Sequence, residues 1–159
     1  MAKRLKGNIV TVIGGPHPTA MPNETMERFK GSLDFLFAGE AERGLSGLLD
    51  SLGSGKTELS DIPGLVWRKD GRVVSNPQTF TEDLDSLGMP AWDLIHPETY
   101  PEAQHGAFFR KFPIAPIMLT RGCPYSCTFC AGSVVSGRRV RKRGIENVLE
   151  ELTLLHDKF

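Results

Sequence analysis

Cysteine, net charge and long apolar runs are all scarce in this sequence of 159 residues. The formal net charge is zero, so no overall field attracts nucleic acid or an anionic membrane, and any such attraction must come from a local patch. No apolar run approaches the length of a transmembrane helix, and no apolar segment follows the charged start MAKRLKGN as it would in a signal peptide. The three cysteines lie close together, which argues against a disulfide framework and for a reducing compartment. We therefore expect a cytoplasmic protein without membrane insertion, for which nucleic acid is not the expected partner.

The cysteines fall in the stretch TRGCPYSCTFC as Cys123, Cys127 and Cys130, a C-x3-C-x2-C array directly after an apolar run at 117–119. Thiolates this close can converge on one soft centre, and both zinc and iron–sulfur clusters take thiolate ligands. Zinc sites usually add a second, distant pair, and bacterial ferredoxins repeat C-x2-C and add a fourth cysteine, so neither pattern fits. A four-iron cluster held by three cysteines would leave one iron open to a chelating ligand. The alternative is three cysteines that bind nothing, because cysteine is often a small apolar core residue.

The N-terminal half alternates strand-like and helix-like patterns, which predicts an α/β fold. Apolar runs at 9–13 and 33–37 do not alternate with polar residues, as is typical of parallel strands buried on both faces. Helices are predicted near 22–29 and, from leucines at helical spacing, over 45–52 with an end at Gly53. The β-forming runs 65–68 and 72–74 flank Lys69-Asp70-Gly71, which predicts a hairpin.

Gly14, Gly15 and His17 directly follow the first predicted strand. Paired glycines let backbone approach a ligand at the carboxyl end of a sheet, but they serve equally well in a tight strand-to-helix turn. For His17, a loop-shaping or cofactor-contacting role is favoured over metal ligation. Gly55-Lys56-Thr57 is not a phosphate-binding loop, because the motif requires an earlier glycine and a preceding strand.

The remaining sequence predicts a connector and the start of a second domain. Residues 79–115 are rich in proline and aromatics with little periodicity, while a strand is predicted at 117–120 and a helix at 144–159. One strand and one helix cannot enclose a core. We therefore expect an internal fragment of a larger enzyme, with domain pieces at 1–78 and 116–159.

The cysteine stretch resembles the radical S-adenosylmethionine (SAM) superfamily, including the flanking Arg121-Gly122, Pro124 and Phe129. Four further segments resemble, in the same order, its subfamily with an N-terminal cobalamin-binding domain. They are GGPHPTAMP at 14–22, GEAE at 39–42, the Asp70-Gly71 hairpin and MPAWDL at 89–94.

This resemblance implies the end of a flavodoxin-like cobalamin-binding domain, followed by the first βα unit of a partial (β/α) barrel. It also implies that Cys123, Cys127 and Cys130 hold a 4Fe-4S cluster whose fourth iron chelates SAM, and that Phe129 contacts the cofactors. Gly14, Gly15 and His17 would lie at cobalamin. An electron donor such as flavodoxin or ferredoxin would start radical chemistry on an unreactive carbon of a small or unidentified substrate, in many members a methyl transfer. The fragment alone is expected to be inactive.

Two other readings stay open. The basic run 137–143 resembles the arginine-rich segment of radical SAM tRNA methylthiotransferases, although those enzymes carry three further cysteines that this chain lacks. The same arginines could simply pair with local carboxylates. The second alternative is that the chain is a non-catalytic iron–sulfur or cofactor-binding module.

Overall fold

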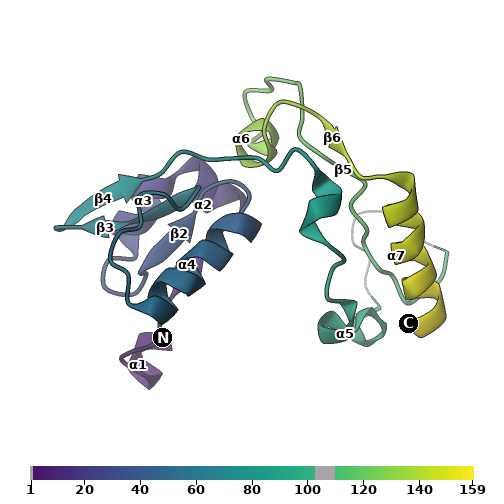
Figure 1. Cartoon of the computed structure of the whole chain (residues 1–159), viewed down its shortest axis with the longest axis horizontal. Helices are drawn as coiled ribbons and strands as arrows, with labels where there is room; N and C mark the ends of the chain where they lie inside the picture. Colours follow the sequence, from purple (N-terminus) through teal and green to yellow (C-terminus); the bar gives the residue numbers. More distant parts are fainter. Residues whose placement is uncertain (1, 103–109) are drawn as a thin grey trace. The chain divides into compact units, whose positions relative to one another are not determined.

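The structure, a computed structural model, describes residues 2–102 and 110–159 (Figure 1). The α-helices, 3-10 helices (η) and strands follow one another in chain order as α1 (Ala2–Leu5), β1 (Val12–Ile13), α2 (Pro16–Ala20), α3 (Pro22–Arg28), β2 (Phe35–Phe37), α4 (Glu42–Ser54), β3 (Leu65–Lys69), β4 (Arg72–Ser75), η1 (Leu84–Leu87), α5 (Trp92–Ile95), η2 (Pro97–Thr99), β5 (Thr120–Arg121), α6 (Gly132–Ser136), β6 (Arg141–Lys142) and α7 (Ile145–Lys158).

The chain forms two compact units. The sheet unit comprises Met1–Glu82 and Gly122–Val140, and the α7 unit comprises Asp83–Arg121 and Arg141–Phe159. The cysteine stretch thus packs with the sheet unit. The predicted connector contributes to both units, and its residues 103–109 lie outside the described residues.

The sheet unit is built on a four-stranded sheet in the order β1-β2-β3-β4, in which β1 and β2 are parallel and the other pairs antiparallel. Successive residues of β2 face opposite sides, as strand geometry requires. Phe37 packs in a cluster with Leu48 of α4, while Leu36 packs in a second cluster with Met26 of α3. Helices therefore cover both faces, which confirms the predicted α/β class.

The predicted hairpin and the helix at 22–29 are confirmed. Asp70 and Gly71 both have positive φ, 50° and 78°, as a two-residue type I′ turn between twisted strands requires. The second predicted helix extends further than expected. Gly53 lies inside α4, and the helix ends at Ser54 because Gly55 adopts the left-handed conformation, φ 69°.

Two strand predictions are wrong in detail. β1 has only two residues, and the side chains of its apolar run are exposed instead of buried on both faces, because β1 is an edge strand that pairs only with β2. The predicted strand at 117–120 forms only at Thr120–Arg121, where β6 supplies an antiparallel partner. Met118 and Leu119 precede it as exposed irregular chain.

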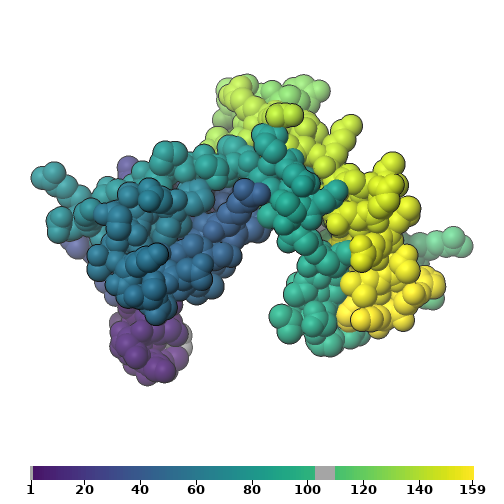
Figure 2. Space-filling model, viewed as in Figure 1, coloured from purple at the N-terminus to yellow at the C-terminus, as the bar shows by residue number. Residues whose placement is uncertain are grey.

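The ends of the chain differ in their packing. α1 has no buried residue and projects from the rest of the sheet unit, at the purple end of the space-filling view (Figure 2). α7 confirms the predicted C-terminal helix, yet Ile145, Leu149 and Leu152 on its apolar face are exposed. No helix within the described ranges has the length and hydrophobicity needed to cross a membrane.

Candidate functional site

The cysteine loop is held closed by the segment that follows α6. The Cys123 amide donates to the carbonyl of Gly137 at 2.9 Å, and the Arg138 guanidinium donates to the Ser126 hydroxyl at 2.7 Å. Gly122 has φ 97°, and a Cβ there would lie 2.8 Å from the carbonyl carbon of Arg139 and closer still to its oxygen. Only glycine allows this approach, so Gly122 is required for closure of the loop. We call these contacts of Gly122, Cys123 and Ser126 with 137–139 the loop clasp.

The three thiols are free and accessible. Cys123 is half-buried, and Cys127 and Cys130 are exposed. Within the described ranges, no three histidine, cysteine or acidic side chains are gathered closely enough to hold a metal ion, so the sulfurs do not converge on one point. Their chemistry still fits a cluster, because three soft donors lie on one short loop and the Gly132 amide already donates to the Cys130 sulfur at 3.3 Å. Ligation by these cysteines stays a prediction.

Phe129, the aromatic residue before the last cysteine, is 91% exposed. Within residues 2–102 and 110–159 nothing buries its ring, so it contributes little to the stability of the loop. The ring is therefore available to a cofactor or a partner, and its role stays a prediction.

Gly14 and Gly15 form the turn between β1 and α2. Gly15 has φ 106° and precedes the first residue of α2, while its carbonyl accepts from the Thr19 hydroxyl at 2.8 Å. The same hydroxyl accepts from the Gly39 amide at 3.0 Å, which joins the turn to the carboxyl end of β2. The segment thus forms a tight strand-to-helix turn in which Gly14 is exposed, and contact of Gly14 and Gly15 with a cofactor stays a prediction. His17 lies in α2 with an exposed side chain.

The structure brings these two predicted sites together. α2, which follows the Gly14-Gly15 turn, contacts α6, which follows Cys130. The sequence predicted neither short helix as an element. The repeated glycines Gly132 and Gly137 around α6 were the only available signal, and they indicate a turn without indicating its partner.

Comparisons with known proteins agree with the cysteine motif. No protein-family model matches the chain. An uncharacterized methyltransferase of Pyrococcus horikoshii is 33% identical over 100% of this chain and 33% of its own length. The cobalamin-dependent radical SAM methyltransferase TokK of Streptomyces tokunonensis is 25% identical over 96% of this chain and 22% of its own length. The homologues of this chain thus include a cobalamin-dependent radical SAM methyltransferase, in agreement with the resemblance of its cysteine stretch.

A solved structure supports the fold. The radical SAM methyltransferase TsrM of Kitasatospora setae, with cobalamin and a [4Fe-4S] cluster bound, superposes with a TM-score of 0.63 at 20% identity, over 93% of this chain and 29% of that one. At this identity the likeness concerns the fold alone. The chain spans a third or less of the length of the relatives named here.

Part of the basic run is engaged in contacts within the protein's own structure. In the sheet unit, Arg139 pairs with Glu82 at 2.9 Å. In the α7 unit, Arg143 pairs with the buried Glu151, and Arg141 is itself buried. Arg141 and Arg143 are therefore poorly available for RNA phosphates, whereas Arg139 stays exposed in a weak surface pair.

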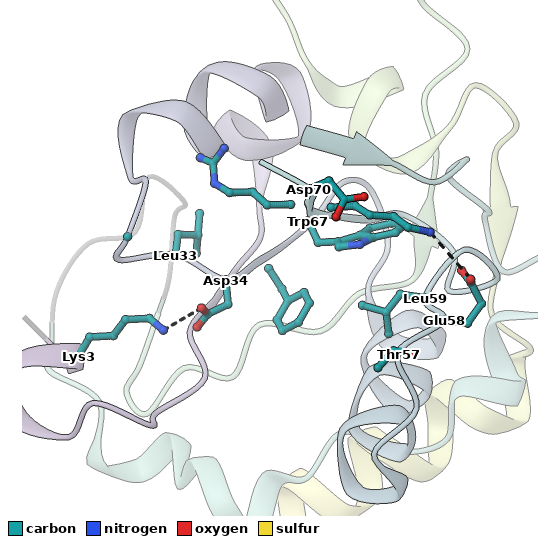
Figure 3. A pocket seen from close by; sticks show the side chains of 12 residues that line it. Lys3, Leu33, Asp34, Thr57, Glu58, Leu59, Trp67 and Asp70 are labelled. Atoms are coloured by element: carbon teal, nitrogen blue, oxygen red, sulfur yellow. Dashed lines mark hydrogen bonds and ion pairs between the residues drawn. The ribbon is translucent and has the colours of Figure 1, made fainter. Parts of the chain in front are cut away.

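The sheet unit also has a hollow of about 800 Å³ away from the Gly14-Gly15 turn (Figure 3). It lies at the amino end of β2, opposite the carboxyl ends where open α/β sheets bind ligands. Two ion pairs lie among the residues that line it: Lys3 contacts Asp34 at 2.7 Å, and Lys69 contacts Glu58 at 4.0 Å. None of the predicted site residues lines it.

Proposed function

We propose that this chain carries the cluster-binding segment of a cobalamin-dependent radical SAM enzyme, most simply a methyltransferase. The observation that supports this most strongly is the C-x3-C-x2-C loop itself, with all three thiols free and accessible and the loop closed by its own clasp. The relatives named methyltransferases support the same reading.

In this proposal Cys123, Cys127 and Cys130 hold three irons of a 4Fe-4S cluster, and the fourth iron is left to the amino and carboxylate groups of SAM. When bound, the cluster supplies the electron that cleaves SAM, and cobalamin supplies the methyl group. The chain's own contribution is positional. The clasp fixes the start of the loop at Cys123, and the Gly132 amide stabilises negative charge on the Cys130 sulfur.

Cobalamin is proposed to lie at the Gly14-Gly15 turn. The contact of α2 with α6 supports this, because it holds the turn beside the segment that follows the last cysteine. TsrM was solved with both cofactors bound. The finer architecture is part of the proposal: a flavodoxin-like piece at 1–78, a connector at 79–115 and the first βα unit of a partial barrel at 116–159. His17 is proposed to contact cofactor without ligating cobalt.

The reaction partners are proposed on the same basis. We expect an external electron donor such as flavodoxin or ferredoxin, and a small-molecule substrate whose unreactive carbon is modified. The chain spans a third or less of the relatives named above, so turnover is expected to require residues outside it. The alternative from another class is a non-catalytic iron–sulfur module.

Anaerobic reconstitution with iron and sulfide tests the cluster site. Wild type should take up about four irons per chain, and alanine at Cys123, Cys127 or Cys130 should each abolish stable uptake. Thr128→Ala, on the same exposed loop, is the matched control and should load normally. Equal loading of the cysteine variants and the control would overturn the assignment.

Absorbance titration with hydroxocobalamin tests the second cofactor. A Cβ on Gly14 would meet only the Phe37 carbonyl oxygen, at an ordinary 3.7 Å, so Gly14→Val should fold while obstructing ligand approach. Gly7→Val is the control, since a Cβ on Gly7 meets nothing within 4 Å. Weaker binding by the Gly14 variant alone is expected. No binding by wild type, or equal binding by both variants, would contradict the proposed location.

A further inference from the structure

The buried residue of α7 is a carboxylate, although the leucine spacing of this helix predicts an apolar buried face. Glu151 is 1% exposed and is the only fully buried residue of α7, while Leu149 and Leu152 on either side of it are exposed. A buried carboxylate is costly unless it is paired and hydrogen-bonded, so a specific arrangement must hold it.

Both oxygens of Glu151 are engaged by other side chains, one of them from a distant part of the chain. Oε1 accepts from the indole Nε1 of Trp92 at 2.9 Å, and Trp92 is itself buried in the connector. Oε2 accepts from Nη1 of Arg143, whose side chain is 9% exposed. The carboxylate is therefore fully satisfied, and loss of its charge would leave a buried guanidinium without its counter-ion.

Arg143 also contacts the residues that precede β5 and the cysteine loop. Its Nη1 donates to the carbonyl of Met118 at 3.1 Å, and its backbone amide donates to the carbonyl of Leu119 at 3.1 Å. The next residues are β5, Thr120–Arg121, followed at once by Gly122 and Cys123. Arg143, which pairs with Glu151, thus contacts both residue 118 and residue 119, which precede β5 and the first cysteine.

We propose that Glu151 and Arg143 are positioning residues for the cysteine loop, and that Trp92 ties this pair to the connector. The inference deepens the proposed cluster function and rests on it for its consequence, while the restraint on 118–121 is a property of the chain by itself. A disturbance of the connector at Trp92 would reach residues 118–119 through Glu151 and Arg143.

Hydrogen exchange in the cluster-free full chain tests the restraint. Glu151→Gln keeps the size of the side chain and its acceptor for Trp92 but removes the charge that pairs with Arg143. The amides of β5 and of Cys123 should exchange about tenfold faster, as expected for the loss of a charge-assisted hydrogen bond, while amides of β3 in the sheet unit should not change. Glu150→Gln, one residue away on the exposed side of α7, is the matched control.

Cluster release to an iron chelator, measured below the unfolding transition, tests the consequence. Release should be faster from Glu151→Gln than from wild type and Glu150→Gln. If Glu151→Gln fails to fold, Trp92→Phe removes only one donor and should show the same changes in milder form. Unchanged exchange of the β5 and Cys123 amides, exchange raised equally throughout the chain, or unchanged release from a loaded variant would each overturn the inference. Failure of wild type to load a cluster would instead count against the proposed function, and the exchange result would still stand.

Discussion

Replacement of Gly122 by alanine should open the cysteine loop while leaving the sheet intact. Two costs combine at this position. A non-glycine residue at φ 97° is strained by about 1–2 kcal/mol, and the new Cβ would overlap the Arg139 carbonyl, which must move and break the hydrogen bond from Cys123 to Gly137. That bond contributes about 1 kcal/mol. The total of about 2–3 kcal/mol corresponds to a shift of about 30- to 150-fold toward the open loop.

Exchange of the Cys123 amide measures this opening directly, because that amide is the donor in the clasp. Gly31→Ala is the matched control, since Gly31 also has positive φ, 81°, but a Cβ there meets nothing within 4 Å. The control should lose about 1 kcal/mol of stability through strain alone, with no effect on the loop. If Cys123 exchanges equally slowly in wild type and Gly122→Ala, the loop is not held by this contact and the reasoning is refuted.

Three further predictions concern the framework around the site. Gly44→Ala would place a Cβ 2.6 Å from Cε1 of Phe37, so urea unfolding should show a loss of about 1–3 kcal/mol from overpacking. At Asp34, burial raises the pKa, but hydrogen bonds including one from Lys3 lower it more, so the folded pKa lies below the unfolded one. Its stabilising contribution should therefore be present above about pH 4 and fade as the pH falls through the folded pKa, and Asp34→Asn should remove that dependence in acid titrations of stability. Asp85 accepts from the amide at the start of α7 at 2.9 Å and 3.1 Å, so Asp85→Ala should cost about 1 kcal/mol in urea unfolding, and an unchanged midpoint would contradict its capping role.

Local chemistry made much of the sheet unit predictable. Asp70-Gly71 specifies a turn with two positive φ values, and the alternation of Phe35–Phe37 between two core clusters follows from a strand covered on both faces. The resemblance of the cysteine stretch to a known family could be seen for a similar reason, because its residues lie within one short loop of the sequence.

Two kinds of feature could not be predicted, namely which of several glycines adopts the left-handed conformation and which residues meet through long-range contacts. The end of α4 is set at Gly55 instead of Gly53 because only Gly55 adopts the left-handed conformation. On α7 the leucine spacing indicated the helix correctly but not its buried position, since burial of Glu151 depends on Trp92, 59 residues away. Closure of the cysteine loop likewise depends on 137–139, which the sequence shows only as part of a basic run.

Electron paramagnetic resonance of the reduced, reconstituted protein, recorded with and without SAM, tests the central claim most directly. Three cysteines leave one iron of a four-iron cluster open, so SAM should shift the signal by chelating that iron, and Cys127→Ala should show no such signal. A four-iron signal that SAM does not alter would contradict the radical SAM function and favour a non-catalytic iron–sulfur module.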